Sequence, residues 1–268
     1  MTFKITELYV YPIKSLGGIS LQTSKLTPKG LEYDRRWLLT DSNGQFITQR
    51  NMPSLVFFKT ALAQNGIVVS HKNSDKDLFV PARSADAKDR RMKVVIWDDV
   101  VNAVVESEEI NDWFSKLMGF EVYLVFIPDG ERRVVHNHPD AEINFPDAAP
   151  YLFLSQTALD YLNGQLEQKI PINRFRANVI FEGGSPHIED NWQTFKIGEA
   201  EFEAIKNCGR CQVITTNQET AEVGKEPLRT LATYRKEGQR ILFGRYFKLK
   251  GKQHFEVKIG DEVEVLGS

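Results

Sequence analysis

The stretch Val56-Phe-Phe-Lys-Thr-Ala-Leu-Ala-Gln-Asn-Gly-Ile-Val-Val-Ser70 decides the fold class of this chain. It holds two β-rich runs, 56–62 and 67–70, joined through Asn65-Gly66, and Asn-Gly between such runs is the strongest short-range signal for a β-hairpin. Comparable runs, separated by turn residues, lie at 5–13, 19–26, 37–40, 46–48 and 94–97. We therefore expect an antiparallel β-barrel or sandwich in the first part of the chain.

Three later segments carry helical signals. Residues 107–118 bring Ile110, Phe114 and Leu117 to one side, with Ser107 as the expected N-cap and Gly119 as the stop. Further helices are predicted for 155–166 and 227–235.

The remaining segments predict a second β-rich unit. Strands are expected at 176–181, 195–205, 212–216, 243–249 and 255–265, whereas residues 128–150 read as a long functional loop. The sequence thus predicts a mainly β chain of the α+β class with a few helices. We place an N-terminal β-barrel-like domain over residues 1–120 and a second β-barrel domain over residues 121–268.

The composition excludes several classes of protein. Hydrophobic residues make up 41% and charged residues 26% of the 268 residues, as in ordinary globular proteins. The net charge of −2 gives no whole-molecule attraction for nucleic acid. We expect no membrane association, because no apolar run reaches the roughly 18 residues that a spanning helix needs. Two cysteines are too few for a secreted disulfide framework, so a cytoplasmic location is expected.

The two cysteines form the one Cys-x-x-Cys cluster, Cys208-Gly-Arg-Cys211. Zinc would need further ligands, for which His136 and His138 are weak candidates. A thioredoxin-like pair should open a helix, but the β-branched residues after Cys211 favour a strand. One reactive thiolate, favoured by the charge of Arg210, and two small buried side chains remain as alternatives.

Basic residues next to predicted strands suggest an anion site. Lys14-Ser15 lies before a Leu-Gly-Gly turn, and paired arginines occur at 35–36 and at 174 and 176. Lysine, hydroxyl and backbone amides suit a phosphate, and a guanidinium can bind it through two hydrogen bonds. Surface salt bridges are the competing explanation for the arginines.

Taken in order, these fragments resemble the MOSC family with its N-terminal β-barrel domain, the group that includes the mitochondrial amidoxime-reducing component and bacterial relatives. The resemblance spans nearly the whole chain. It is carried by Tyr11-Pro-Ile-Lys-Ser15, Gly30-Leu-Glu-Tyr-Asp-Arg-Arg-Trp37, Arg176-Ala-Asn178, Cys208-Gly-Arg-Cys211 with the following Thr215-Thr216, Lys225-Glu-Pro-Leu228 and Phe243-Gly-Arg-Tyr246.

The resemblance implies a molybdenum–pterin cofactor whose metal is bound by the thiolate of Cys211, with Cys208 as a bystander. It also implies that the cofactor is held by Lys14, Ser15, Arg35, Arg176, Asn178, Gly209, Arg210 and Tyr246. Ala148 and Ala149 occupy a position where hydroxyl side chains are expected, so backbone contacts alone carry over there. Pyridoxal phosphate binding is implied only as a description of the family at large.

The implied activity is the reduction of small N-hydroxylated compounds, namely amidoximes, hydroxylamines and N-hydroxylated base analogues. Electrons would come from a separate flavin reductase, ferredoxin-type or cytochrome b5-type protein. A sulfur carrier or transferase with a persulfide on Cys211, and a non-catalytic cofactor carrier, are the alternatives. Asn217-Gln-Glu-Thr-Ala221 replaces the Asp-Pro-x-Thr-Gly turn often found in the family, and we expect it to alter a loop without loss of activity.

Overall fold

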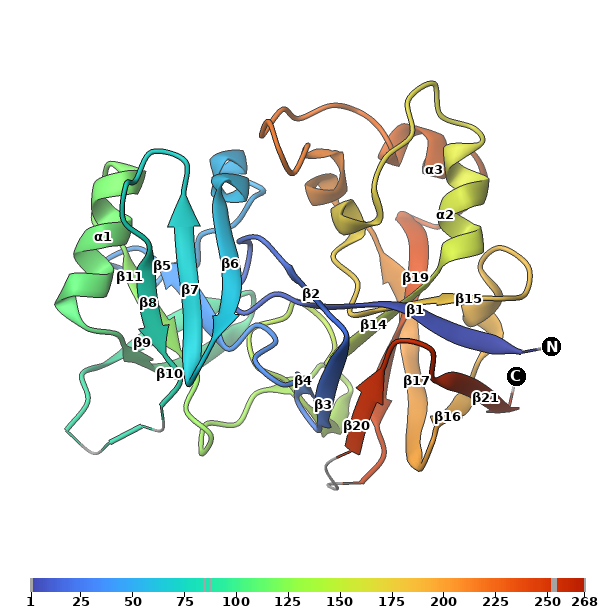
Figure 1. Cartoon of the computed structure of the whole chain (residues 1–268), viewed down its shortest axis with the longest axis horizontal. Coiled ribbons are helices and arrows are strands. Elements are labelled where there is room, and N and C mark those ends of the chain that lie inside the picture. The colour runs from blue at the N-terminus through green and yellow to red at the C-terminus, as the bar shows by residue number, and fades with distance from the viewer. Residues whose placement is uncertain (1, 84, 87, 252–254, 268) are drawn as a thin grey trace.

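The computed structural model describes residues 2–83, 85–86, 88–251 and 255–267. Two β-rich units lie side by side along the long axis of the molecule, and both chain ends lie on the same unit (Figure 1). The predicted mainly β fold class is confirmed, and the second unit is a closed barrel whereas the first is an open half-barrel.

The closed barrel contains seven strands whose first and last members pair with each other. Its order is β14-β15-β1-β21-β16-β17-β19, and β19 pairs back to β14. The pairing of β14 with β15 is parallel, and the other pairings around the barrel are antiparallel. The strands are β14 (Tyr151–Ser155), β15 (Val179–Glu182), β1 (Phe3–Val10), β21 (Glu262–Gly267), β16 (Thr194–Ile197), β17 (Ala200–Gly209) and β19 (Arg240–Leu249).

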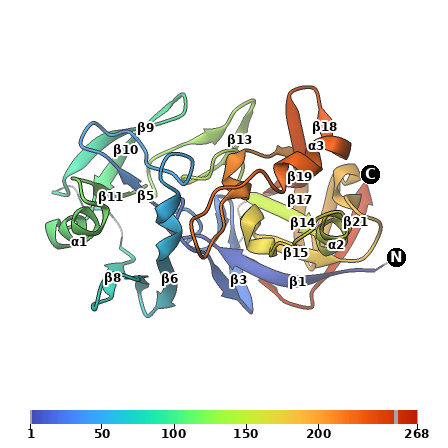
Figure 2. The ribbon, with the colours of Figure 1, turned by 90° about the horizontal axis from the view of Figure 1, so that it is seen from above.

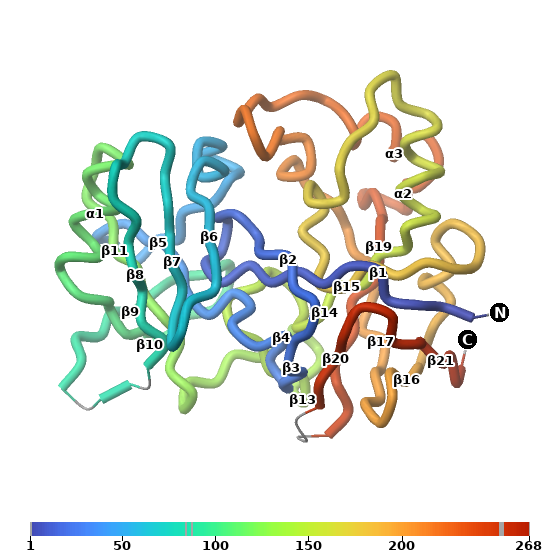
Figure 3. Tube along the Cα trace, in the orientation of Figure 1, coloured from blue at the N-terminus to red at the C-terminus, as the bar shows by residue number. Residues whose placement is uncertain are grey.

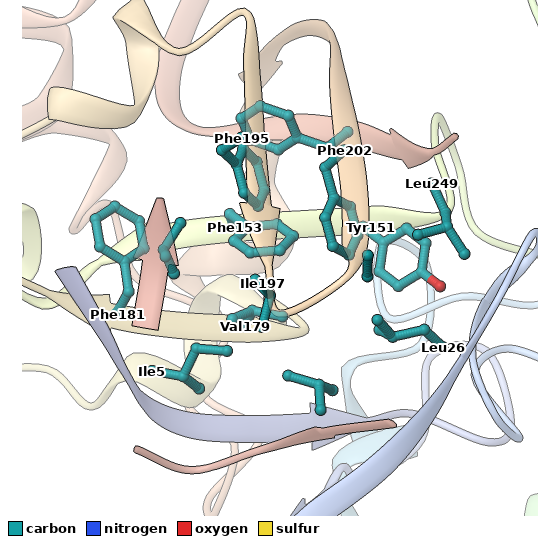
Figure 4. Packing of buried hydrophobic residues seen from close by; sticks show 14 of the residues in the cluster. Ile5, Leu26, Tyr151, Phe153, Val179, Phe181, Phe195, Ile197, Phe202 and Leu249 are labelled. Carbon is teal, nitrogen blue, oxygen red and sulfur yellow. The ribbon is translucent and has the colours of Figure 1, made fainter. Parts of the chain in front are cut away.

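Aromatic side chains fill the interior of this barrel. Phe195 stacks on Phe202 with ring centroids 4.9 Å apart, and Phe153 meets both rings edge to face (Figure 4). Burial of such a side chain contributes roughly 1.5–3 kcal/mol each. The packed interior holds the strand ends in fixed positions, and these ends carry the site described below.

The half-barrel is built from two sheets. One has the order β5-β11-β10-β9, and the other is β6-β7-β8. The predicted hairpin is confirmed, because β6 and β7 pair from Phe58↔His71 to Ala63↔Gly66. The strands are β5 (Trp37–Thr40), β11 (Tyr123–Phe126), β10 (Asp99–Val105), β9 (Arg91–Ile96), β6 (Phe58–Ala63), β7 (Gly66–His71) and β8 (Leu78–Pro81).

Helix α1 (Glu108–Met118) closes one side of the half-barrel and confirms the predicted caps. The Ser107 hydroxyl accepts a hydrogen bond from the Ile110 amide, and Gly119 adopts a left-handed conformation with φ 80°. Phe114 is fully buried against the sheets.

The remaining elements are short. Helix α2 (Gln156–Asn163) and helix α3 (Leu228–Tyr234) pack on the barrel (Figure 2). The short strands are β2 (Ile19–Leu21), β3 (Thr23–Thr27), β4 (Gly30–Leu31), β12 (Val134–Val135), β13 (His138–Glu142), β18 (Lys236–Glu237) and β20 (Phe255–Lys258). The 3-10 helices are η1 (Pro53–Phe57), η2 (Ile172–Phe175), η3 (Ile188–Asn191) and η4 (Gln212–Thr215).

The structure corrects two local expectations. Residues 212–216 were expected to form a strand, but Gln212–Thr215 is a 3-10 helix in which the Thr215 hydroxyl donates to the Gln212 carbonyl. Residues 128–150 are not one long loop, because β12 and β13 pair within them. The side chains of Ile143 and Phe145 are buried, which anchors this segment to the rest of the fold.

The two structural units interleave along the chain. Strand β1, although first in sequence, pairs with β15 and β21 inside the closed barrel (Figure 3). Strand β11 pairs with β5 in the half-barrel although it follows residue 120. The domain boundary that the sequence analysis placed after residue 120 therefore stays a prediction.

Candidate functional site

A cleft of about 720 Å³ lies where the half-barrel meets the closed barrel. Its volume is in the range of small-molecule and cofactor sites, which is about 300–1,000 Å³. The cleft brings together every residue that the sequence analysis placed at the site: Lys14, Ser15, Arg35, Ala148, Ala149, Arg176, Asn178, Gly209, Arg210, Cys211 and Tyr246.

The two cysteines have different environments. Cys211 is exposed and immediately precedes η4, so its thiol is accessible from the cleft. Cys208 lies on β17 and is buried with the apolar residues beneath α2 and α3. Burial raises the pKa of the Cys208 thiol, although nearby Arg210 partly opposes this. A reaction that needs an accessible thiolate is therefore served by Cys211.

Positive charge dominates the lining of the cleft. Eight cationic side chains contribute to it, against the one carboxylate of Asp147 among the described residues that line the cleft. This excess contrasts with the net charge of −2 for the whole chain and favours an anionic ligand. The eight are Lys14, Arg35, Arg50, Arg174, Arg176, Lys206, Arg210 and Arg240.

Arg35 and Arg176 are fixed around one buried ring. The guanidinium carbons lie 4.3 Å and 4.2 Å from the Tyr11 ring centroid, an arrangement that gains cation–π attraction. Arg35 Nη1 pairs with Asp34 Oδ2 at 2.6 Å, and Arg176 Nη1 donates to the Leu16 carbonyl at 2.7 Å. Burial lowers the pKa of Arg176 to about 10, so it remains charged at neutral pH.

Two other arginines keep unused donors. Arg210 donates to the carbonyls of Phe243 and Phe175, both at 2.8 Å, while its buried Nη2 has no hydrogen-bond partner among the described residues. The same holds for Nε of Arg174, whose Nη1 donates to the Thr215 carbonyl at 3.2 Å. A buried guanidinium nitrogen without a partner is costly, so each of these nitrogens is a candidate donor to an anionic ligand.

Lys14, Arg50 and Asp147 form an ion network at the other side of the cleft. Asp147 pairs with Lys14 and accepts from Arg50 Nη2 at 2.6 Å. Burial lowers the pKa of Lys14 to about 8, with Asp147 opposing the shift. Burial acts to raise the pKa of Asp147, but Lys14 and Arg50 together outweigh it and hold that pKa well below the usual range.

Arg50 and Asp147 were missed by the sequence analysis. Both line the cleft, and the Cys211 sulfur is one of the partners that raise the pKa of Arg50. Nothing in the sequence near Arg50 signals a site, because it follows a turn far from the motifs. Asp147 directly precedes Ala148, so its position next to that predicted pair was a usable signal.

Asn178 and Tyr246 contribute through their positions in the barrel wall. The Asn178 amide is engaged by backbone, accepting from the Leu152 amide and donating to the Tyr9 carbonyl, both at 3.2 Å. It therefore links β1 and β14, which lie on either side of β15, next to the cleft. Tyr246 lies beside Cys208, and burial raises its pKa well above the usual range.

No group of three or more His, Cys, Asp or Glu side chains is placed to share a metal ion in the part of the chain that the structure describes, so the zinc alternative has no ligand set there. No helix within the described ranges has both the length and the apolar character needed to cross a membrane.

The chain is similar to proteins of known name over nearly its whole length. It is 32% identical over 261 residues to "Molybdenum cofactor sulfurase" of Oryza sativa subsp. japonica, covering 90% of this chain and 32% of that protein. It is 29% identical over 287 residues to "Mitochondrial amidoxime-reducing component 1" of Homo sapiens, covering 98% of this chain and 83% of that protein. The chain thus spans about a third of the length of the sulfurases that it matches.

The YUAD protein from Bacillus subtilis is a solved structure with some similarity, at a TM-score of 0.41 and 12% identity, covering 99% of this chain and 96% of that chain.

Family models divide the chain into two matched regions. The MOSC N-terminal beta barrel domain matches residues 2–121, and the MOSC domain matches residues 140–264. The chain therefore belongs to the MOSC family, among the members in which the MOSC domain follows a MOSC N-terminal β-barrel domain.

Proposed function

We propose that this protein binds a molybdenum–pterin cofactor in the cleft and reduces small N-hydroxylated compounds, with electrons from a separate protein. The substrates would be amidoximes, hydroxylamines and N-hydroxylated base analogues. The observation that supports this most is the exposed thiol of Cys211 in a cleft lined by cations from both structural units. A relative named for amidoxime reduction that aligns with 98% of the chain supports the same reaction.

The side chains of the cleft fit such a cofactor. Its phosphate is an anion, and the unpartnered nitrogens of Arg210 and Arg174 would donate to it together with Arg176. The Cys211 thiolate is a soft ligand suited to molybdenum bound by sulfur. When bound, the cofactor supplies the two-electron chemistry that breaks the N–O bond.

The chain's own groups would supply position and protons. Reduction of an N–OH group to N–H and water consumes two electrons and two protons. Lys14 lines the cleft, and its pKa near 8 makes it a group that exchanges a proton close to neutral pH. The pair of the buried Lys14 with Asp147, and the hydrogen bond from Lys14 to the Phe145 carbonyl, keep that ammonium in one place.

Turnover of benzamidoxime tests this proposal. The protein is produced in a host that makes the cofactor, its molybdenum content is measured by elemental analysis, and reduction is assayed with an artificial reductant. Cys211→Ala should abolish turnover, and Cys208→Ala serves as the matched control with a mild effect. Verified molybdenum-loaded protein that reduces no N-hydroxylated compound would refute the proposal.

A second candidate is a sulfur carrier or transferase that holds a persulfide on Cys211. Two observations favour it: the Cys211 thiol is exposed beside Arg50, and several similar proteins are named molybdenum cofactor sulfurase. A persulfide requires an accessible nucleophilic thiolate and no metal. Intact-mass measurement that finds one added sulfur atom on metal-free protein, absent in Cys211→Ala, would favour this function.

A non-catalytic carrier of the cofactor is the third candidate. Cys211→Ala separates it from the reductase, because storage through the arginines should largely survive while turnover should not. The molybdenum content of that variant, compared with that of Cys208→Ala, is the measurement.

A further inference from the structure

Trp97 occupies the edge of the cleft in a backbone conformation that a large side chain rarely adopts. It lies in the two-residue turn between β9 and β10, where Ile96 pairs with Asp99. Its φ is 55°, a left-handed value that Asn or Gly adopts freely in such turns but that strains an aromatic residue. The side chain is nevertheless 47% exposed, so burial in the core does not explain why a tryptophan stands here.

The indole is held in a fixed orientation by three contacts. Its Nε1 donates to Asp147 Oδ1 at 3.1 Å, and the Arg50 guanidinium carbon lies 4.7 Å from the ring centroid. Phe46 meets the ring edge to face, with centroids 5.2 Å apart. The ring is thus pre-organised although much of it faces solvent, which lowers the entropy lost when a ligand binds.

Arg50 and Asp147, which contact Trp97, lie in the same cleft as the sulfur of Cys211. Trp97, Arg50, Asp147 and Cys211 all line the one cleft, and Arg50 interacts with both Trp97 and Cys211. A ligand that reacts beside Cys211 therefore approaches a stack of two flat groups, in which the Arg50 guanidinium lies over the indole ring of Trp97. Both groups bind flat conjugated rings by stacking.

We propose that Trp97 and Arg50 form a stacking wall that selects substrates whose N-hydroxylated group is attached to a planar aromatic ring. This inference rests on the proposed function and narrows it to aromatic amidoximes and N-hydroxylated bases over saturated analogues. Strain at Trp97 persists because the ring is needed at this point of the cleft. Stacking of a base on an aromatic side chain typically changes affinity by roughly 10-fold to 100-fold.

Tryptophan fluorescence tests the wall without turnover. Benzamidoxime is added to the oxidised holoprotein without reductant, and cyclohexanecarboxamidoxime, with the same reactive group on a saturated ring, is the comparison ligand. Trp37 and Trp192 are buried and Trp113 lies in α1 outside the cleft lining, so quenching should report mainly on Trp97. We expect quenching by the aromatic ligand in the wild type and in the control Trp113→Phe, and its loss in Trp97→Phe.

Substrate selectivity provides the second measurement. In Trp97→Ala the ratio of kcat/KM for benzamidoxime to that for the saturated analogue should fall about 10-fold, mainly through KM. Trp97→Phe should retain most of the ratio. Both variants lose the indole N–H, but Trp97→Phe keeps an aromatic ring. This comparison separates stacking from the hydrogen bond to Asp147.

The outcomes distinguish this inference from the proposed function. If wild-type protein reduces both compounds but Trp97→Ala leaves their ratio unchanged, the stacking wall is wrong and the reductase stands. If wild-type protein reduces neither compound while benzamidoxime still quenches the fluorescence of Trp97, the stacking wall is supported as a binding surface and the proposed reductase activity is refuted. Absence of quenching in wild-type protein, together with an unchanged ratio in Trp97→Ala, overturns the wall outright.

Discussion

The guanidinium of Arg50 lies beside the sulfur of Cys211, although Arg50 belongs to the half-barrel side of the cleft and Cys211 follows a strand of the closed barrel. Next to this pair, the side-chain Nε2 of Gln212 donates a hydrogen bond to the Arg50 carbonyl at 2.8 Å. In general, a cation next to a cysteine favours the thiolate form that acts as the nucleophile. Residues of both structural units thus surround the Cys211 thiol.

Replacement of Arg50 should therefore slow the chemistry of Cys211. We expect Arg50→Ala to reduce the rate of iodoacetamide alkylation of Cys211 at neutral pH several-fold, and Arg50→Lys to reduce it less, because a positive charge remains. Peptide mass spectrometry over a time course measures the rate. Arg36→Ala, which removes an arginine paired with Asp129 outside the cleft lining, is the control. Equal rates in wild type and Arg50→Ala would contradict the expectation.

Anion binding in the cleft should weaken as the pH rises through about 8. Burial lowers the pKa of Lys14 to about 8, so the ammonium is charged below that pH and loses its charge above it. A hydrogen bond to a charged group contributes about 1.5–3 kcal/mol, so its loss should weaken binding roughly 10-fold or more. Sulfate is the suitable probe, because its own charge is constant over this range. Calorimetric titration at pH 7 and pH 9 gives the two affinities.

Lys14→Arg is the control for the pH effect. Its guanidinium stays charged at both pH values, so the ratio of the two affinities should approach one. If Lys14→Arg shows the same weakening as the wild type, another group is responsible and the assignment to Lys14 is wrong.

How much of this could be read from the sequence depends on whether the signal is local. The hairpin at Asn65-Gly66 and the caps of α1 at Ser107 and Gly119 are set by neighbouring residues, and the predictions there are confirmed. The pairing of β1 with β21 joins opposite ends of the chain, which no local pattern encodes. The β-branched run after Cys211 favoured a strand, but its backbone turns into η4 where the barrel wall ends.

The residues of the site can likewise be divided into those with a local sequence signal and those without one. The resemblance in sequence named residues that the fold gathers in one cleft, and most of them lie in a recognisable motif. Arg50 and Asp147 are 97 residues apart and stand in no motif, and only the folded chain shows their 2.6 Å contact. Trp97 was expected at the end of a strand, whereas its strained turn conformation became visible only in three dimensions.

The loop at Asn217–Ala221 offers a stabilising substitution. Ala221 has φ 65°, and its amide closes the loop by donating to the Asn217 carbonyl at 3.0 Å. A left-handed conformation costs an L-residue with a Cβ roughly 1–2 kcal/mol, and glycine avoids this cost but loses more chain entropy on folding. We expect Ala221→Gly to raise the free energy of unfolding by up to about 1 kcal/mol, measured by urea denaturation.

Ala63→Gly is the matched control, because Ala63 lies in strand β6 and its φ is not among the positive values of the described residues. There the same change should lower the free energy of unfolding by about 0.5–1 kcal/mol. A loss of similar size in both variants would show that strain at Ala221 is negligible. Activity should not differ, since the loop carries no residue of the cleft lining.

Glu189 should make the protein less stable as the pH rises from about 4.5 to 7. It is fully buried in η3, with Oε1 accepting from the Ser155 amide at 3.3 Å and Oε2 unpartnered among the described residues. Burial, with a smaller contribution from Asp190, raises its pKa to about 7, while Arg235 opposes the shift. Between the pKa of Glu189 in the unfolded chain, about 4.5, and its pKa in the folded protein, about 7, the folded state binds one more proton than the unfolded state. The stability of the folded state therefore falls as the pH rises through this range.

Glu189→Gln removes this titration while its amide oxygen can still accept from Ser155. Because a pKa unit corresponds to about 1.4 kcal/mol, the variant should gain on the order of 1–3 kcal/mol over the wild type at pH 8 relative to pH 5. Urea denaturation at the two pH values measures the difference. The charge of Arg245, which also faces Glu189, is retained in both proteins. A constant difference between variant and wild type at the two pH values would contradict this expectation, because it would mean that Glu189 does not titrate in this range.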